Sequence, residues 1–212
     1  MKPLVIATHN VKKAGEMMTI LSAALPHRRL LTLADFPNAP EPEETGPSYE
    51  ANALIKARSA VKVTGEECIA DDAGLEVDAL DGAPGVFSKR FGGEDLPFPK
   101  KIERMLKMLE SVPEPQRSAR FRCWVALVSP EGEEHTFEGI CEGRIATEPK
   151  GENGFGYDPI FFLPELDRTM AQLTPSEKHA ISHRGIVLGE VIAHLYPDAP
   201  ALAGPIPPSE RS

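Results

Sequence analysis

The sequence of 212 residues has few cysteines, few aromatic residues and no long apolar run. Its three cysteines, Cys68, Cys123 and Cys141, are an odd number without CxxC spacing, which argues against a disulfide framework and a zinc knuckle. No stretch reaches the roughly 18 apolar residues of a membrane span, and the opening MKPLVIATHN is too short for a signal-peptide core. We therefore expect a reduced, cytoplasmic protein with no membrane partner.

Positive charge is also scarce, because 23 lysines and arginines face 32 aspartates and glutamates, for a formal net charge of −9. Proteins that bind nucleic acid by covering its phosphate backbone are usually basic, so we expect no nucleic-acid partner. A small phosphate-bearing molecule is still compatible with this charge, because a few local cations and a metal ion suffice to bind it.

Motifs of several common enzyme classes are missing. No GxGxxG follows the first apolar run and no Gly-Lys dipeptide occurs, which excludes the dinucleotide fingerprint and the Walker A loop. Asp71-Asp72 is followed by Ala73, so the D-x-D pattern of aspartyl phosphatases is absent. His179 and His183 have zinc-ligand spacing, but the glutamate of HExxH is missing. These absences exclude enzyme classes without naming one.

Apolar periodicity predicts strands alternating with helices, then a hairpin and a last helix, which is typical of a mixed α/β fold. Strands are expected at 4–7, 29–33, 68–70, 75–79 and 160–163, and hairpin strands at 121–129 and 135–144. Helices are expected to end near residue 24, to cover 49–62 and 102–109, and to run from Thr174 to about 196. The prolines at 113–118 are interpreted as a border between two lobes.

A polar hexapeptide follows the first predicted strand and precedes a helix. Backbone N–H groups at a helix start, with a hydroxyl, an amide and two ammonium groups, could cradle phosphates. An equally weighted alternative is a simple helix cap followed by solvated lysines. The six residues are Thr8, His9, Asn10, Val11, Lys12 and Lys13.

Two acidic groups are candidates for a metal site. Asp71-Asp72 lies at a predicted strand end, where adjacent carboxylates repel each other unless a cation compensates. Magnesium is usually held by one or two carboxylates and substrate phosphates, and Glu41, Glu43 or Glu44 could add a ligand from a loop. Taken separately, each group is more often a solvated acidic turn.

Two later segments could bind a flat base. Phe155 and Tyr157 lie beside glycines that permit close backbone approach, and stacking of a base on either ring would contribute ~1–3 kcal/mol. His183 and Arg184, after Lys178, offer donors for a carbonyl oxygen on a base. The alternatives are a turn with buried aromatics and a helix surface with scattered charge.

Taken in order, these segments resemble the non-canonical purine nucleoside triphosphate pyrophosphatases, also called inosine triphosphatases or dITP/XTP pyrophosphatases. The resemblance runs from Leu4 to Gly185. The matching segments are IATHNVKKAGE, EETGPSYEANALIKA, IADDAGLEVDALDGAPGVFSKRF, ARFRC, GFGYDPIFF and LTPSEKHAISHRG.

The resemblance implies an α/β fold with an elongated mixed β-sheet flanked by helices, two lobes and a central substrate cleft. Residues 1–196 would form one two-lobed domain, followed by a loosely ordered Pro-rich tail at 197–212. The implied activity is magnesium-dependent hydrolysis of ITP, dITP and XTP to the monophosphate and pyrophosphate, which cleanses the nucleotide pool. The family is usually homodimeric.

The resemblance also implies roles for individual residues. Asp72 matches the general base and metal ligand, Glu44 or its neighbour Glu43 the second metal ligand, and Lys56 a lysine near the phosphates. Lys56 and Lys13 together would counter the charge that develops on the phosphates. The hexapeptide matches the phosphate-binding loop, and substrate would also contact Ala73, Phe155, Gly156, Tyr157, Asp158, Lys178, His183 and Arg184.

One departure and two alternatives accompany this interpretation. Ala73 stands where the family usually has serine, so only its backbone N–H is expected to contact substrate. A nucleotide-binding regulator without turnover is the competing class, and the acidic pairs favour the enzyme because a regulator would not need them. A pyrophosphatase acting on other modified nucleotides is the alternative among enzymes.

Overall fold

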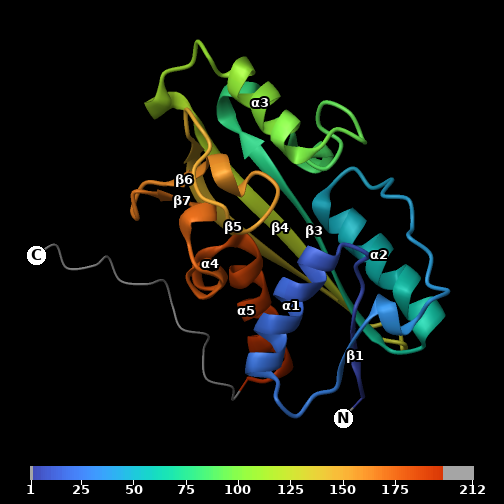
Figure 1. The fold of residues 1–212 in the computed structure, drawn as a ribbon. Coiled ribbons are helices and arrows are strands. Elements are labelled where there is room, and N and C mark those ends of the chain that lie inside the picture. Colours follow the sequence, from blue (N-terminus) through green and yellow to red (C-terminus); the bar gives the residue numbers. More distant parts are fainter. Residues whose placement is uncertain (1, 198–212) are drawn as a thin grey trace, which may run out of the picture. The chain divides into compact units, whose positions relative to one another are not determined.

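The computed structural model describes residues 2–197, and Figure 1 labels its elements. Within these residues, seven strands form one sheet in the order β2-β1-β3-β4-β5-β6-β7. The strands are β1 (Leu4–Ile6), β2 (Leu30–Thr32), β3 (Glu67–Val77), β4 (Ser118–Val128), β5 (Glu134–Ile145), β6 (Phe161–Leu163) and β7 (Arg168–Thr169). The helices are α1 (Val11–Ala24), α2 (Tyr49–Thr64), α3 (Phe98–Met108), α4 (Pro175–Ile181) and α5 (His183–Leu195).

The sheet is mixed, as expected. Strand β1 pairs in parallel with β2 and β3, whereas β6 pairs antiparallel with β5 and β7. The α/β class with helices flanking a mixed sheet is therefore confirmed. No helix of residues 2–197 is long and apolar enough to cross a membrane.

The described chain divides into two compact units. The first contains Cys123–Gly139, the chain before Gly74, and the chain from Arg184 onward. The second contains Gly74–Arg122 and Ile140–His183. The proline-rich break at 113–118 lies inside the second unit, so the lobe border predicted there is wrong. A break in helix and strand propensity does not mark where the contacts of a chain divide.

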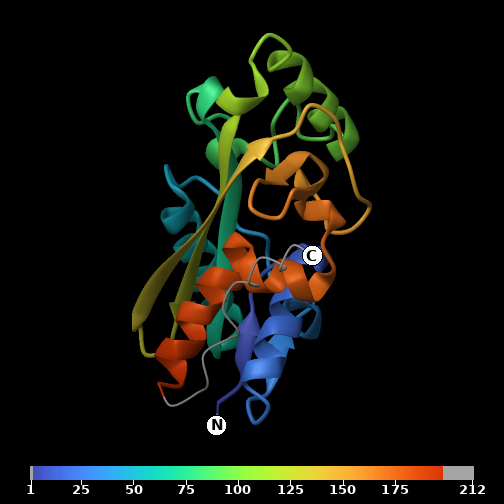
Figure 2. The ribbon, with the colours of Figure 1, turned by 90° about the vertical axis from the view of Figure 1, so that its left-hand side faces the viewer.

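In the first unit, alternate strand residues face two helical layers, because side chains of a strand point to opposite faces with period two. Leu4 and Ile6 of β1 pack against α1 and α5, whereas Val5 between them packs against α2. The α2 layer uses the small residues Ala53, Ala57 and Ala60, which allow the helix close to the sheet. Figures 1 and 2 show α1 and α5 on one face and α2 on the other.

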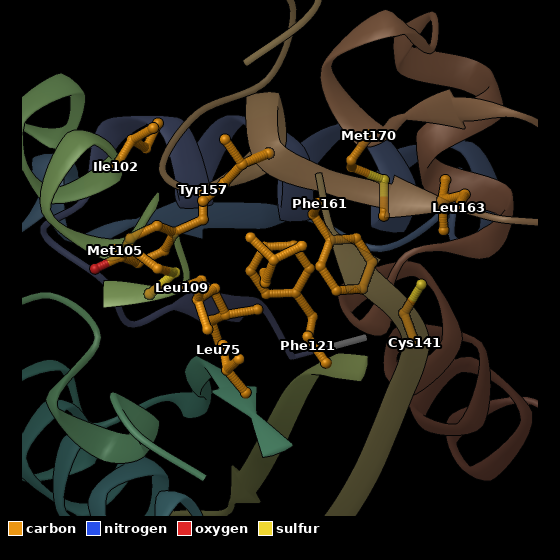
Figure 3. Packing of buried hydrophobic residues seen from close by; sticks show 14 of the residues in the cluster. Leu75, Ile102, Met105, Leu109, Phe121, Cys141, Tyr157, Phe161, Leu163 and Met170 are labelled. Carbon is orange, nitrogen blue, oxygen red and sulfur yellow. The ribbon is translucent and has the colours of Figure 1, made fainter. Parts of the chain in front are cut away.

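The second unit has a core of its own, shown in Figure 3. Phe121 of β4 and Phe161 of β6 contact each other with ring centroids 4.3 Å apart. The other members come from β3, α3, β5 and the chain between β5 and α4, and include Leu75, Ile102, Met105, Leu109, Cys141, Tyr157, Leu163 and Met170. This core supports the loop that carries Phe155 and Tyr157.

Several predicted helix ends and the hairpin are confirmed. Ser48 is the N-cap of α2, where its Oγ accepts from the Ala51 N–H at 3.2 Å. Thr174 and Glu177 form the expected capping box of α4. Strands β4 and β5 are joined by a turn in which the Gly132 N–H donates to the Ser129 carbonyl at 3.1 Å.

Two predicted elements are wrong. Residues 68–79, expected as two strands, belong mainly to the single strand β3, which continues past its pairing with β1 because β4 lies on its other side. The last helix is broken at Ser182, whose backbone is extended with φ −71° and ψ 155°, so that His183 begins a new helix. Most of the predicted loose tail, residues 198–212, lies outside the described residues.

Candidate active site

The loop after β1 leads directly into α1. Strand β1 lies between β2 and β3, and the helices that follow β1 and β2 pack on opposite faces of the sheet. In α/β sheets, such a switch point at the carboxyl ends of parallel strands is where ligands bind. The predicted phosphate loop, residues 8–13, therefore occupies a position where a ligand is expected.

The start of α1 is capped by the loop itself. Asn10 Oδ1 accepts from the backbone N–H groups of Lys12 at 3.0 Å and Lys13 at 3.2 Å, and Thr8 Oγ1 accepts from the Asn10 N–H at 3.2 Å. Asn10 is thus the N-cap of α1, the arrangement that the sequence pattern predicted as the alternative to a phosphate-binding loop. His9, Asn10, Val11 and Lys12 are exposed, so their side chains are accessible to a ligand.

Asp71 is held by two cations from the α1 and α5 layer. Its Oδ2 accepts from Arg184 Nε at 3.2 Å and Nη2 at 2.8 Å, and Lys13 Nζ lies 3.2 Å from the same oxygen. Burial favours the neutral acid, but the charges of Lys13 and Arg184 hold the pKa of Asp71 well below its usual range. Asp71 is therefore an ionised, buried carboxylate.

Asp72 points to the other face of β3, toward α2. Its Oδ1 accepts from Lys56 Nζ at 2.9 Å, and its Oδ2 accepts from Asn52 Nδ2 at 3.3 Å. The two aspartates thus have different partners, because neighbouring residues of a strand alternate in direction. Each carboxylate has its own cations, with Lys13 and Arg184 at Asp71 and Lys56 at Asp72.

Lys56 joins Asp72 to the acidic loop. Its Nζ donates to Glu44 Oε1 and Asp72 Oδ1, both at 2.9 Å. Burial raises the pKa of Asp72, although the positive charges of Lys56 and Lys13 act in the opposite direction. Burial disfavours the charged form of Lys56, but Asp72, Asp71 and Glu44 together raise the pKa of that ammonium above its ordinary value.

The structure distinguishes the two adjacent glutamates. Glu44 is half-buried and contacts Lys56, whereas Glu43 is exposed. Ala73 is partly buried against the core beneath α1 and α5. Of the two glutamates, Glu44 is therefore the one that shares the Lys56 ammonium with Asp72.

Sequence reasoning missed Asn52, which is buried. Its Nδ2 contacts Asp72, and its Oδ1 accepts from the Gly46 N–H at 2.8 Å, so it links the acidic loop to the carboxylate. A Cβ at Gly46 would lie 2.7 Å from Asn52 Oδ1, which explains a glycine there. The available signal was spacing, because Asn52 and Lys56 are four apart on a helix and share a face.

The predicted base-binding loop is organised by Asp158. Its Oδ2 accepts from the Phe155 N–H at 2.8 Å and from Lys178 Nζ at 2.7 Å, and both Asp158 and Lys178 are buried. The Lys178 ammonium lies 4.6 Å from the centroid of the Phe155 ring, within range of a cation–π interaction. A Cβ at Gly154 would lie 2.1 Å from Asp158 Oδ2, so this position has no space for a side chain.

The two aromatic residues differ in exposure. Tyr157 is 3% exposed and its hydroxyl donates to the Ser88 carbonyl at 3.0 Å, whereas Phe155 is half-buried. The expectation that a base could stack on Tyr157 is therefore wrong, because its ring is enclosed by the core. Gly156, which is partly buried, has φ +68°, a conformation that glycine adopts without strain.

His183 and Arg184 have different surroundings. The His183 ring stacks on Phe121 with centroids 4.8 Å apart and is 5% exposed. Arg184 donates through Nη1 to Glu16 Oε2 at 2.7 Å, besides its two contacts with Asp71. The sequence predicted both residues as donors to a base. It did not identify Glu16, for which the available signal was its position one helical turn after Lys13 on α1.

The chain is similar to known proteins over most of its length. A dITP/XTP pyrophosphatase of Desulforamulus reducens is 46% identical over 196 residues, which cover 91% of this chain and 96% of that protein. A dITP/XTP pyrophosphatase of Geobacter sulfurreducens is 49% identical over 195 residues, covering 92% and 97%.

Solved structures with a similar fold and sequence lead to the same family. A HAM1 protein from Coxiella burnetii is 42% identical with a TM-score of 0.84, covering 93% of this chain and 100% of that one. A nucleoside-triphosphatase / dITP/XTP pyrophosphatase from Mycobacterium abscessus is 45% identical with a TM-score of 0.70, covering 92% and 99%. The sequence profile of the Ham1 family matches residues 4–194, and the chain belongs to this family.

Proposed function

We propose that this protein hydrolyses non-canonical purine nucleoside triphosphates, namely ITP, dITP and XTP, to the monophosphate and pyrophosphate, and so cleanses the nucleotide pool. The observation that carries the proposal is the group formed by Asp72, Glu44 and Lys56, with Lys56 Nζ 2.9 Å from each carboxylate. The names of its 46–49% identical relatives support the substrate class.

We propose Mg²⁺ as the metal, with Asp72 and Glu44 as its protein ligands. No group of three or more His, Cys, Asp and Glu side chains suited to a metal occurs within residues 2–197. Two carboxylates fit magnesium, which keeps several waters and uses substrate phosphates as further ligands. The buried Asp71 Oδ1 has no hydrogen-bond partner in the described chain, but Asp71 faces the opposite side of β3 and is not counted among the proposed ligands. When bound, the ion would neutralise charge on phosphate oxygens.

Asp72 is the proposed general base. A carboxylate whose pKa is raised by burial accepts a proton more readily, and Asn52 fixes its orientation through Oδ2. Asp72 would orient or deprotonate the water that attacks the α-phosphorus, a role worth ~10²–10⁴-fold in rate. Lys13 and Lys56 would counter the charge that develops on the leaving pyrophosphate.

The loop at 154–158 is the proposed purine site. The half-buried Phe155 ring would stack on the base, with the Lys178 ammonium 4.6 Å from its centroid and Asp158 fixing the backbone. His183 would donate to the 6-oxo group, which adenine lacks, and an unmet buried donor costs ~1–3 kcal/mol. Gly156, Arg184, the Ala73 N–H and residues 8–13 complete the proposed substrate contacts, whereas the enclosed Tyr157 supports the loop.

We further propose that residues 1–196 act as one domain in a cytoplasmic homodimer. The three cysteines are free and buried, which suits a reducing compartment. Light scattering coupled to size exclusion tests the assembly, and a monomer of 23.1 kDa would contradict the homodimer.

The function is tested by following phosphate products from ITP, XTP, dITP, GTP, ATP and dTTP with Mg²⁺. We expect pyrophosphate as the first product, and faster turnover of the first three nucleotides than of the others. Orthophosphate as the first product would contradict the pyrophosphatase, and binding without turnover would identify a regulator. Preference for dTTP would place the enzyme with those acting on other nucleotides.

A further inference from the structure

Lys101 is a buried cation outside the groups described above. It lies on α3 in the second unit and is 1% exposed. Its Nζ donates to the Lys89 carbonyl at 2.8 Å and to the Gly93 carbonyl at 2.6 Å. Within residues 2–197 no carboxylate pairs with it. Burying an ammonium without a counter-charge is unfavourable, so its hydrogen bonds to the two carbonyls must compensate.

Those hydrogen bonds fix the segment that follows Ser88 at Lys89 and Gly93, while Ser88 itself accepts from the Leu75 N–H through Oγ at 2.8 Å. Lys89 and Arg90 within it are exposed, so the segment has little apolar packing of its own beyond Phe91. Gly93 has φ +140°, which turns the chain so that its carbonyl reaches the same ammonium as that of Lys89. Lys101 therefore replaces the packing that this segment lacks.

The same segment supports the loop at 154–158. The Ser88 carbonyl, directly before Lys89, accepts the Tyr157 hydroxyl at 3.0 Å. The Phe98 ring, one turn before Lys101, packs edge-on against Tyr157 with centroids 5.4 Å apart, and the Lys101 ammonium lies 5.9 Å from the Phe98 centroid. Asp158 and Lys178 hold this loop independently, through the Phe155 N–H and Phe155 ring.

We propose that Lys101 is a positioning residue for purine binding: it fixes the Ser88–Gly93 segment, which through the Tyr157 hydroxyl fixes the Phe155 loop. The purine as ligand rests on the proposed function, whereas the connection from Lys101 to the Phe155 loop does not. A cation bound only to carbonyls provides position without placing a charge at the base. The residue touches neither the reacting atoms nor the proposed metal ligands.

The experiment compares Lys101→Met, Tyr157→Phe and the double variant. Each single change should raise KM for ITP roughly 5- to 30-fold, the factor that corresponds to one or two kcal/mol, and leave kcat nearly unchanged. Because both changes act on one connection, the double variant should be no worse than the more severe single variant. Lys101→Arg, which keeps two donors, should recover most of the affinity. Additive effects, or a loss confined to kcat, would overturn the proposal.

Lys100→Met is the matched control, because Lys100 is the adjacent lysine and forms an exposed pair with Glu103 at 2.7 Å. It should leave KM and kcat unchanged, and an effect equal to that of Lys101→Met would overturn the assignment.

Amide hydrogen exchange supplies a readout that needs no substrate. In Lys101→Met, and in Tyr157→Phe if the first variant does not fold, exchange should become faster at residues 153–158 as well as at 88–93. Unchanged exchange at 153–158 would overturn the proposal even if activity fell. If the unmodified protein releases no pyrophosphate from ITP, the proposed function fails, while the exchange result still decides whether Lys101 positions the loop.

Discussion

Arg184 and Asp71 form a buried ion pair in which Nε and Nη2 of the guanidinium donate to one oxygen, Asp71 Oδ2, at 3.2 and 2.8 Å. The two residues are 113 positions apart and come from α5 and β3. Glu16 of α1 contacts the remaining side of the guanidinium, so the pair connects three elements of the first unit. Its geometry predicts a structural role, in addition to the proposed contact of Arg184 with substrate.

Arg184→Met should therefore lower the free energy of unfolding by ~3–5 kcal/mol, because the fully buried Asp71 loses its most buried cation and keeps the less buried Lys13. Urea denaturation measures this loss. Arg58→Met is the matched control, since Arg58 makes a two-point contact with Glu134, at 2.6 Å and 2.6 Å, on the exposed surface. Such a surface pair contributes ~0.2–1 kcal/mol. Equal losses in the two variants would refute a special role for the buried pair.

Asp72→Asn should reduce kcat for ITP by ~10²–10⁴-fold, because the amide cannot accept the proton of the attacking water. Pyrophosphate release at saturating Mg²⁺ and ITP measures it. Asp78→Asn serves as the control, since Asp78 lies in the second unit and contacts Arg120 and Ser118. Near-normal turnover of Asp72→Asn would show that another group is the base.

Glu44→Gln and Glu43→Gln separate the two adjacent glutamates. Glu44 contacts Lys56 beside Asp72, whereas Glu43 is exposed. Glu44→Gln should raise the half-saturating Mg²⁺ concentration roughly 10-fold or more, since even outer partners of a metal site are worth 10–100-fold. Magnesium titration of pyrophosphate release distinguishes the two, and the opposite ranking would assign the ligand to Glu43.

Glu177 predicts a pH dependence of stability. Glu177 accepts hydrogen bonds from the Thr174 N–H at 2.7 Å and from Arg168 Nη2 at 2.9 Å. These bonds, the first of them most strongly, lower the pKa of Glu177 from 4.5 to about 2. A pKa lowered in the folded state stabilises the protein above the unfolded value, and this contribution is lost as the pH falls from 4.5 toward 2.

Glu177→Gln isolates this charge, because glutamine also completes a capping box. The wild-type protein should have the higher Tm at neutral pH, and the difference should shrink as the pH falls below about 4.5. Thermal unfolding across this range measures it, with the exposed Glu165→Gln as a comparison. A difference that stays constant down to about pH 3 would contradict the charge effect.

Much of the fold could be predicted from local patterns. The caps at Ser48 and Thr174, the turn at Gly132, the apolar run of β1 and the apolar periodicity of α1 depend on neighbours within one turn or one strand. The errors arose where local propensity did not decide the outcome. Strand β3 continues past Asp72 because β4 pairs alongside, and the last helix breaks at Ser182 although its local propensity is helical.

For the candidate site, the sequence by itself determined the residue types, their order and the family to which they belong. Tertiary structure decided that Asp71 and Asp72 face opposite layers, that Glu44 rather than Glu43 meets Lys56, and that Tyr157 is enclosed. Asn52, Glu16 and Lys101 emerged only there, because their partners lie on other elements of the chain. Local periodicity carries information about a residue's own element, and the contacts that give these side chains their roles form only when separate elements pack together.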